Sequence, residues 1–498
     1  MRSPSTHRLS SRWGPAGYAP APTGGRDSGA TRRTRGTALD KIFITGGHRL
    51  EGRIRISGSK NATLAILAAA LAGKGTVTLR NVPDIGDIET MFELFRVLGC
   101  GVSAIPGTGE ITLDPSRLTS AEAPYDIVNR MRASFNVLGP LLARFGEARV
   151  ALPGGCDIGA RPVDFHLKGL EAMGAELHVD KGYVEAKAPR LKGANILMDY
   201  PSVTATEHLM ATACLAEGRT IIENAAMEPE VVDTAVFLSK MGGRIWGAGT
   251  KTIEIEGVGE LGGCRHSVIP DRMEAGTFAI AAAITGGEIF LEGAVPEHMT
   301  ATLLKLQQTG TNVEPLGLAP RADHLSGAPR MTDMYEPNGR VESDNVTPAH
   351  GLMVIGPKQI KAVDLKTMPH PGFPTDMQQP MAALLALADG CSLITETLFE
   401  RRFKYINELQ RMGANVKTDG QSAIILGVDH LVGCPVQASD LRAGAALVLA
   451  GLVAEGETEI DKVAYIDRGY SQIVKKLSGV GAEISRGQSE APVLSLAA

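Results

Sequence analysis

The chain has 498 residues, of which 44% are hydrophobic, 21% charged and 4% aromatic. That apolar fraction excludes a disordered chain, and the length exceeds what one ordinary hydrophobic core holds, so two or more domains are expected. No apolar stretch reaches the roughly 18–20 residues that a membrane-spanning helix needs, which predicts a soluble protein with no membrane partner.

Residues 1–39 differ in composition from the rest. They hold seven of the 50 basic residues, all Arg, and one of the 55 acidic residues, Asp27, so 43 basic and 54 acidic residues remain, with a net charge of −11. Such a body binds nucleic acid poorly, and no nucleic-acid partner is expected. The Arg- and Ser-rich extension is typical of a disordered tail or a misassigned start, which indicates a cytoplasmic protein, or else of a transit peptide to the plastid stroma. Ordered sequence is expected from about Asp40.

The remaining sequence contains six repeats. Each has an apolar helix, a short β-rich run and a second helix that ends in a glycine, which suits a helix C-cap with positive φ. The first helices and their β-runs lie in 62–79, 131–152, 204–222, 273–291, 376–394 and 441–460. The second helices end at Gly99, Gly174, Gly242, Gly310, Gly413 and Gly481. Three repeats in each half predict two similar domains.

One spacing between these glycines is unusual. Gly310 and Gly413 are 103 residues apart, 35 more than the usual 68. The Pro- and Gly-rich residues at about 316–349 account for the excess. They are expected to form a surface loop between the fourth and fifth repeats.

The six cysteines lie far apart, without a CxxC pair. This argues against a disulfide framework and a zinc site, so no metal is expected. Cys156 lies in the Gly-rich segment Leu152–Asp164, and Arg161 five residues on favours its thiolate. A lone cysteine is more often an incidental small residue, and the residues alone leave both readings open.

Several basic residues stand at helix starts or loop ends. Lys60, Arg132 and Arg442 lie where helix amides and the helix dipole attract an anion. The alternative for all such residues is solvated surface charge. Asp376 stands at the start of the first helix of the fifth repeat. There, the alternative to a catalytic role is an ordinary helix N-cap. The sequence contains no Walker loop, no dinucleotide-binding GxGxxG and no HExxH, which argues against nucleotide hydrolysis, dinucleotide redox chemistry and zinc hydrolysis.

At LPGGCDIGARPVDFH the chain resembles the UDP-N-acetylglucosamine 1-carboxyvinyltransferase family, enolpyruvyl transferases of peptidoglycan precursor synthesis. The resemblance covers about 41–487 and includes SGSKNATL, NVPDIGDIET, PYDIVNRMRASFNVLGP, PDRMEAGTF, HPGFPTDMQ, ETLFERRF, SDLRAGAALVLAG and YIDRGY. It implies an inside-out α/β barrel of two domains, each of three βαβαββ-type units. The N-terminal domain would span 60–269, and the C-terminal domain 41–59 plus 270–498.

The resemblance also implies the substrates, phosphoenolpyruvate and UDP-N-acetylglucosamine, and a monomer without a cofactor. It makes Cys156 the proton donor and covalent adduct site, and the target of fosfomycin, with Asp376 a candidate general base. Lys60 and Arg468 complete the catalytic set. The implied substrate contacts are Lys60, Asn61, Arg132, Arg161, Pro162, Val163, Asp164, Phe165, Ser202, Val203, Asp376, Leu398, Arg402, Arg442 and Arg468.

The chain departs from the family pattern at Tyr200–Thr204, where the family has Lys-Val-Ser-Val-Gly. Thr204 and Glu207 could form a capping box there instead. Two rival functions stay open: 5-enolpyruvylshikimate-3-phosphate synthase, which shares the fold and phosphoenolpyruvate, and an inactive scaffold that binds nucleotide sugars.

Overall fold

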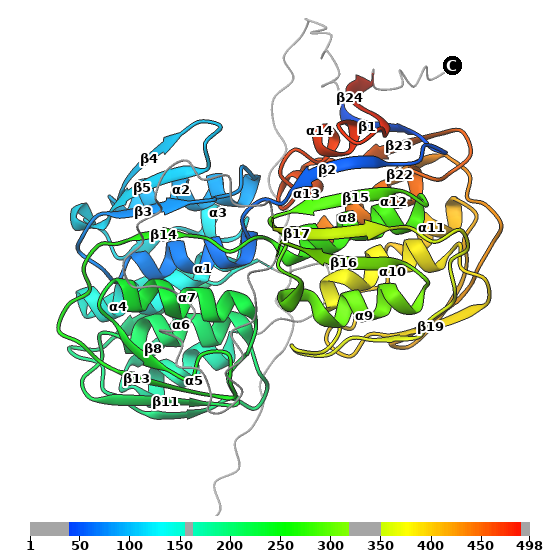
Figure 1. Cartoon of the computed structure of the whole chain (residues 1–498). Helices are drawn as coiled ribbons and strands as arrows, with labels where there is room; N and C mark the ends of the chain where they lie inside the picture. The colour runs from blue at the N-terminus through cyan, green and yellow to red at the C-terminus, as the bar shows by residue number, and fades with distance from the viewer. Residues whose placement is uncertain (1–38, 155–162, 318–349, 490–498) are drawn as a thin grey trace, which may run out of the picture. The chain divides into compact units, whose positions relative to one another are not determined.

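The computed structural model describes residues 39–154, 163–317 and 350–489 (Figure 1). Of the predicted extension, only Leu39 lies within these residues, and it begins the first strand. Within the described ranges no helix is both long and apolar enough to cross a membrane.

The described strands form six four-stranded sheets that share one topology. In each sheet a first strand runs parallel to a second, which is antiparallel to a third, and the third is antiparallel to a fourth. In this order, three sheets consist of β14 (Arg265–Ser267), β3 (Val77–Arg80), β5 (Glu110–Asp114) and β4 (Gly101–Ile105); β6 (Glu122–Ala123), β7 (Glu147–Ala151), β9 (Tyr183–Lys187) and β8 (Glu176–Asp180); and β10 (Asn195–Leu197), β11 (Arg219–Glu223), β13 (Thr252–Glu256) and β12 (Arg244–Trp246).

The other three sheets consist of β2 (Glu51–Arg55), β15 (Glu288–Glu292), β17 (Gly351–Ile355) and β16 (Asn312–Leu316); β18 (Leu365–Lys366), β19 (Cys391–Thr395), β21 (Ser422–Leu426) and β20 (Asn415–Asp419); and β22 (Pro435–Gln437), β23 (Glu457–Asp461), β1 (Leu39–Thr45) and β24 (Glu483–Ser489). Two of these three sheets include a strand from the start of the described chain, β2 in one and β1 in the other.

Helices fill the space that these sheets surround. The inner helices are α1 (Lys60–Ala70), α4 (Leu138–Phe145), α6 (Val203–Ala213), α8 (Arg272–Ile284), α10 (Gln378–Leu385) and α12 (Leu441–Gly451). Nearly all residues of α8, α10 and α12 are buried, and these three helices contact one another. Their many Ala residues permit this close approach, whereas the strands alternate buried and exposed residues and shield the helices from water. Figure 1 shows helices inside and strands outside, which confirms the predicted inside-out α/β barrel fold.

Further helices complete the units. They are α2 (Gly86–Leu98), α3 (Tyr125–Val128), α5 (Asp164–Ala172), α7 (Pro229–Lys240), α9 (Thr300–Gln308), α11 (Ile406–Arg411), α13 (Ala464–Asp467), α14 (Ile473–Ser478) and the 3₁₀ helices η1 (Pro115–Arg117), η2 (Arg132–Val137), η3 (Pro296–Met299) and η5 (Thr375–Met377). All six glycines predicted to end the second helices have φ between 88° and 105°, so the predicted left-handed turns are confirmed.

The described residues form two hydrophobic cores. One contains buried residues between Ala62 and Ile269, and the other combines Ile42–Ile56 with Met273–Ile484. We propose that these cores belong to the two domains expected from the sequence, 60–269 and 41–59 with 270–498.

The predicted insertion at about 316–349 falls almost entirely outside the described residues, but its flanks are placed. Leu316 of β16 and Gly351 of β17 are partners in one antiparallel pair. The insertion therefore joins two neighbouring strands, β16 and β17, of one sheet. The expectation from the sequence, that it separates the fourth repeat from the fifth, is wrong. The spacing of helix-ending glycines could not reveal this, because the whole hairpin lies after Gly310.

Candidate active site

Lys60, Asp87 and Arg468 form the first of two ionic clusters. The Asp87 carboxylate accepts from Lys60 Nζ at 2.7 Å through Oδ2 and from Arg468 Nε at 2.8 Å through Oδ1. Asp87 is buried on α2, whereas the side chain of Arg468, at the end of α13, is 39% exposed. One carboxylate thus holds two cations from distant parts of the sequence side by side.

The backbone around Lys60 is fixed by a crossing of two chain segments. Ser59 donates its N–H to the carbonyl of Ile269 at 2.7 Å, and Asp271 donates its N–H to that of Ser57 at 2.8 Å. Gly58 is required there, because a Cβ atom would lie 1.6 Å from the carbonyl oxygen of Asn81. This crossing places Lys60 at the first position of α1.

Asp271 connects the starts of two inner helices. Its Oδ1 accepts from the N–H groups of Met273 and Glu274 and so caps α8, while Oδ2 accepts from the N–H of Lys60 at 3.0 Å. Ser59 caps α1 by accepting from Ala62. The two caps hold Lys60 at a helix N-terminus, where the helix dipole favours an anion.

Burial and charge act in opposite directions on this cluster. Burial lowers the pKa of Lys60 and the charges of Arg442 and Arg468 lower it further, whereas Asp87 opposes the shift. Burial raises the pKa of Asp87, but the charges of Lys60 and Arg468 outweigh it and leave that pKa below its ordinary value. The cluster therefore holds a carboxylate beside a lysine whose positive charge an added anion would stabilise.

The second cluster surrounds Asp376. Its Oδ1 accepts from Arg402 Nη2 at 2.7 Å and its Oδ2 from Arg442 Nε at 3.1 Å. Both arginines are less than 5% exposed, whereas the Asp376 side chain is 27% exposed. Asp376 lies in η5 and both its oxygens bind arginines, so the alternative of an ordinary N-cap is wrong.

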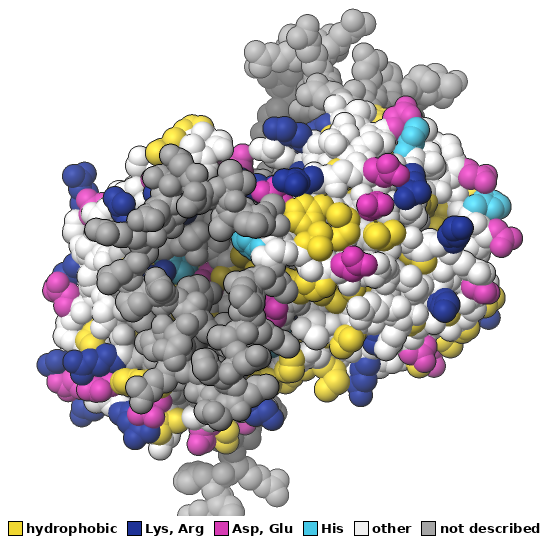
Figure 2. All heavy atoms as spheres, in the orientation of Figure 1, with side chains coloured by type: hydrophobic (Ala, Val, Ile, Leu, Met, Phe, Trp, Pro, Cys, Tyr) yellow, Lys and Arg dark blue, Asp and Glu magenta, His cyan; other side chains and the backbone are white. Residues whose placement is uncertain are grey.

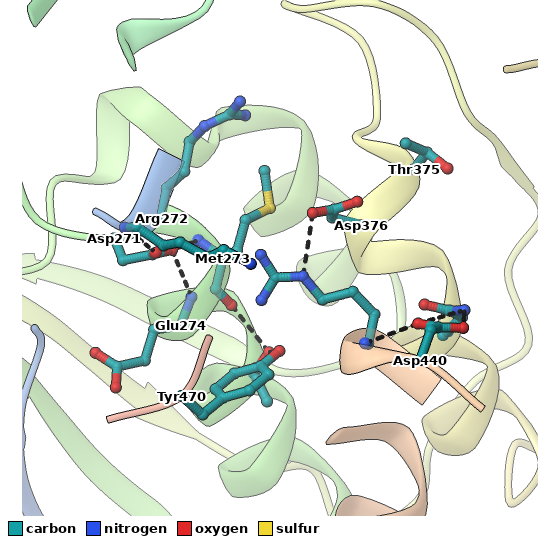
Figure 3. Close-up of polar contacts among 12 residues, drawn as sticks. Asp271, Arg272, Met273, Glu274, Thr375, Asp376, Asp440 and Tyr470 are labelled. Atoms are coloured by element: carbon teal, nitrogen blue, oxygen red, sulfur yellow. Dashed lines mark hydrogen bonds and ion pairs between the residues drawn. The ribbon is translucent and has the colours of Figure 1, made fainter. Parts of the chain in front are cut away.

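Further contacts orient Arg442. Asp440 caps α12 by accepting from the N–H groups of Arg442 and Ala443, and the Arg442 guanidinium lies 5.2 Å from the ring centre of Tyr470. The Tyr470 hydroxyl lies 2.9 Å from that of Thr277 on α8. Asp271, Asp376, Asp440 and Tyr470 surround this polar region in Figure 3.

These pairings shift the protonation of Asp376 strongly. Burial would raise its pKa, but the charges of Arg442 and Arg402 overcome burial and hold the pKa well below the ordinary value of 3.8. Arg402 Nε and Arg442 Nη1 are buried and have no partner within the described residues. The cluster thus offers an ionised carboxylate together with spare guanidinium donors.

The other predicted site residues are distributed over several elements. Asn61 is exposed beside Lys60, and Arg132 is half-buried at the first position of η2. Val163, Asp164 and Phe165 are half-buried at the start of α5, Ser202 and Val203 at the start of α6, and Leu398 after β19. Cys156, Arg161 and Pro162 lie outside the described residues.

The proposed capping box at the start of α6 is wrong. Ser202 caps this helix by accepting from Ala205, and Thr204 instead lies 3.4 Å from His166 Nε2. Glu207 is buried, and burial raises its pKa well above the ordinary value. Tyr200 is 41% exposed, and burial together with the charges of Glu228 and Glu396 raises its pKa to about 12.

Sequence reasoning missed the acidic residues that organise the cations. Asp87, Asp271 and Asp440 were assigned no role, although Asp271 and Asp440 directly precede helices, which is the usual position of an N-cap. Asp87 does not stand at an N-cap position, and its partners Lys60 and Arg468 come close to it only in the folded chain. Tyr470 was missed for the same reason.

The model of the EPSP synthase (3-phosphoshikimate 1-carboxyvinyltransferase) family matches residues 44–477. The chain belongs to this family of enolpyruvyl transferases. It is 50% identical over 448 residues to UDP-N-acetylglucosamine 1-carboxyvinyltransferase 2 of Carboxydothermus hydrogenoformans, covering 90% of this chain and 99% of the relative. It is 49% identical over 450 residues to UDP-N-acetylglucosamine 1-carboxyvinyltransferase 1 of Halalkalibacterium halodurans, covering 90% and 94%.

Solved enolpyruvyl transferase structures agree with this assignment. The crystal structure of the enolpyruvyl transferase NikO from Streptomyces tendae matches with a TM-score of 0.77 at 25% identity, covering 91% of this chain and all of that one. An EPSP synthase structure from Acinetobacter baumannii matches with a TM-score of 0.66 at 18% identity, covering 90% and 100%, and this likeness concerns the fold alone.

Proposed function

We propose that the chain transfers the enolpyruvyl group of phosphoenolpyruvate to the 3′-hydroxyl of UDP-N-acetylglucosamine and releases phosphate, the first committed step of peptidoglycan precursor synthesis. The relatives at about 50% identity carry the name of this activity. The observation that carries the proposal is the pair of ionic clusters, in which Asp87 binds Lys60 and Arg468 and Asp376 binds Arg402 and Arg442.

Phosphoenolpyruvate brings a phosphate and a carboxylate, so its site needs several cations. Lys60, Arg442 and Arg468 supply three, and Arg132 and Arg161 complete the proposed set. Held at a helix N-terminus and in part buried, these charges would stabilise the negative charge that shifts onto the substrate oxygens as the reaction proceeds.

The proposed reaction is an addition followed by an elimination. Asp376 removes the proton of the 3′-hydroxyl as its oxygen bonds to C2 of phosphoenolpyruvate, and the Cys156 thiol delivers a proton to the methylene carbon. The Cys156 thiolate left by that step then takes a proton back from the new methyl group as the bond between C2 and the phosphate oxygen breaks, which releases phosphate and leaves the enol ether. Cys156 is also the proposed site of a covalent adduct with the enolpyruvyl substrate and of alkylation by fosfomycin.

The ion pairs of Asp376 bear on its role as a base. A carboxylate held by Arg402 and Arg442 is a weak base, because its pKa lies far below neutrality. We infer that the substrate anions attract these guanidinium groups in the complex, which would raise the pKa of Asp376 when the hydroxyl is in place.

Asn61 would contact phosphoenolpyruvate beside Lys60, and Arg402 would lie on the substrate side of the site. The proposed contacts of the nucleotide sugar are Arg161, Pro162, Val163, Asp164, Phe165, Ser202, Val203, Asp376 and Leu398. We further propose that the chain acts as a monomer in the cytoplasm and needs no cofactor. The plastid alternative finds no support in relatives from Carboxydothermus hydrogenoformans and Halalkalibacterium halodurans.

Phosphate release tests the proposal. We expect release only when phosphoenolpyruvate and UDP-N-acetylglucosamine are mixed with the enzyme, and none when shikimate 3-phosphate replaces the nucleotide sugar. The reverse preference would establish the EPSP synthase activity, and binding of UDP-N-acetylglucosamine without any turnover would establish the inactive scaffold. Cys156→Ala should retain nucleotide-sugar binding and lose most of the turnover.

A further inference from the structure

Glu396 is a fully buried acid that no step of the proposed reaction uses. It directly follows β19, and its side chain is 0% exposed. A buried carboxylate is stable only when hydrogen bonds replace its hydration, and Glu396 accepts four of them. The four groups that donate these hydrogen bonds indicate the role of Glu396.

The four donors belong to three segments of the fifth repeat. Oε1 accepts from Thr367 Oγ1 at 2.9 Å and from the N–H groups of Leu398 at 2.8 Å and Phe399 at 3.2 Å. Oε2 accepts from Thr375 Oγ1 at 2.7 Å. Thr375 directly precedes Asp376, and Leu398 is a proposed contact of the nucleotide sugar.

The topology explains why these segments meet. Thr367 follows β18 and Glu396 follows β19, and because these strands are parallel their carboxyl ends lie at the same edge of the sheet. Thr397 strengthens the junction by donating its N–H to Thr367 Oγ1 at 2.9 Å and its hydroxyl to the Thr367 carbonyl at 2.6 Å. The segment after β19 is therefore tied to the segment after β18 on both sides of Glu396.

The corresponding position in four other repeats carries no acid. The residues that follow β3, β11, β15 and β23 are Asn81, Asn224, Gly293 and Lys462, and all four have positive φ. The Asn81 side chain donates to the Val268 carbonyl at 2.9 Å, and the Asn224 side chain donates to the Met198 carbonyl at 2.8 Å. The connections that they begin have two to five residues, whereas ten residues, 396–405, separate β19 from α11. A long connection needs added hydrogen bonds to keep one conformation, and here the Glu396 carboxylate provides them.

We propose that Glu396 is a positioning residue of the nucleotide-sugar site, which fixes the Leu398 backbone and the Thr375–Asp376 backbone to one buried carboxylate. The inference rests on the proposed function, because Leu398 and Asp376 are taken from it as contacts of UDP-N-acetylglucosamine. Glu396 does not touch the substrate. It sets the separation between the group that contacts the nucleotide sugar and the group that faces its 3′-hydroxyl.

The test compares Glu396→Ala with Glu396→Gln. Alanine removes all four bonds. Glutamine keeps the three bonds at Oε1 through its amide oxygen, and its amide nitrogen can donate to Thr375 Oγ1, which then acts as acceptor. We expect Glu396→Ala to weaken calorimetric binding of UDP-N-acetylglucosamine about tenfold or more, the loss of one or two charge-assisted hydrogen bonds. Glu396→Gln should restore most of this affinity, and the KM for phosphoenolpyruvate should change less than about twofold in both variants.

Asp364→Ala is the matched control, because Asp364 accepts from the N–H of Leu393 in the same sheet at 2.8 Å and precedes β18 in the sequence, whereas Thr375 and Leu398 follow that strand. Thr375→Val removes only the bond on the Asp376 side, and we expect it to lower kcat while nucleotide-sugar affinity stays within about threefold. If Glu396→Ala fails to fold, Thr375→Val still decides the matter, since an unchanged kcat in that variant would overturn the proposal.

Equal losses in Glu396→Ala and Asp364→Ala, or an equal rise of both KM values, would also overturn it. Failure of the proposed function is visible separately, because the wild-type protein would then not bind UDP-N-acetylglucosamine in the same calorimeter.

Discussion

The two ionic clusters share one design and differ in which partner is exposed. In each, a single carboxylate binds two cations, one through each oxygen. Asp87 is buried, and its partner Arg468 is 39% exposed. Around Asp376 the order is reversed, since Arg402 and Arg442 are less than 5% exposed and the carboxylate side chain is 27% exposed.

This difference separates two jobs for the same residue type. The buried Asp87 carboxylate holds one largely buried cation, Lys60, and one exposed cation, Arg468. It therefore sets the position of positive charge, so Asp87 prepares both cations for an anionic substrate. A more exposed carboxylate with buried cations presents its own oxygens, so Asp376 is the carboxylate that meets a substrate hydroxyl. Figure 2 shows acidic and basic side chains interspersed on the face in view. This mixed surface charge does not by itself distinguish the role of Asp87 from that of Asp376.

The largest expected effect follows from replacing the exposed carboxylate. Asp376→Asn keeps the size of the side chain and removes its ability to take a proton, so we expect kcat to fall by about 10²–10⁴-fold. Binding of UDP-N-acetylglucosamine, measured by calorimetry, should weaken less than about tenfold. A kcat within threefold of the wild type would show that Asp376 is not the base.

Removing each carboxylate outright should destabilise the protein to different extents. Asp376→Ala leaves two buried guanidinium groups without their counter-charge, which costs about 3–5 kcal/mol. In Asp87→Ala the exposed Arg468 can be hydrated, so we expect a smaller loss of about 1–3 kcal/mol. Thermal melting of both variants at pH 7 should give the lower midpoint for Asp376→Ala, and the opposite order would contradict the assignment of exposed and buried partners.

A smaller effect concerns acid pH. The folded-state pKa values of Asp87 and Asp376 both lie below the ordinary 3.8, so the unfolded chain binds more protons in acid. The stabilisation by these pairs is therefore fully present above the ordinary pKa of an aspartate, about 4, and is lost as the pH falls through the folded pKa values.

Melting midpoints between pH 6 and pH 3 check this sign. The gap between the wild type and Asp376→Asn, or Asp87→Asn, should narrow as the pH falls. Asp364→Asn serves as the control, since that residue lies outside both clusters. A gap that stays constant over this range would show that neither ion pair contributes as described.

The repeats could be predicted from the sequence, because each second helix ends in a glycine whose positive φ leaves a recognisable signal at regular spacing. The sheet order could not be predicted in this way. The pairing of β1 with β23 and β24 joins residues more than 400 positions apart, and nothing local specifies it. The insertion was misplaced because the glycine spacing does not show that its two flanks pair as one hairpin.

The site residues likewise fall into those that local sequence could locate and those that only the fold reveals. Lys60, Arg132 and Arg442 were located at helix starts from local sequence, and the structure places all three at or next to the first position of a helix. Asp87 and Glu396 were missed, because a buried acid is identified by its partners and those partners come from other elements. Local patterns thus predict where a cation stands, while its counter-charge depends on the fold.

Single-turnover phosphate release, measured for Asp87→Asn and Asp376→Asn at increasing phosphoenolpyruvate with saturating UDP-N-acetylglucosamine, tests the distinction between the two carboxylates most directly. If Asp87 only positions cations, raising phosphoenolpyruvate should bring Asp87→Asn to within about tenfold of the wild-type rate, because weaker binding is overcome by concentration. Asp376→Asn should stay about 100-fold or more below the wild type at every concentration. Recovery of Asp376→Asn together with persistent failure of Asp87→Asn would contradict the roles assigned to the two clusters.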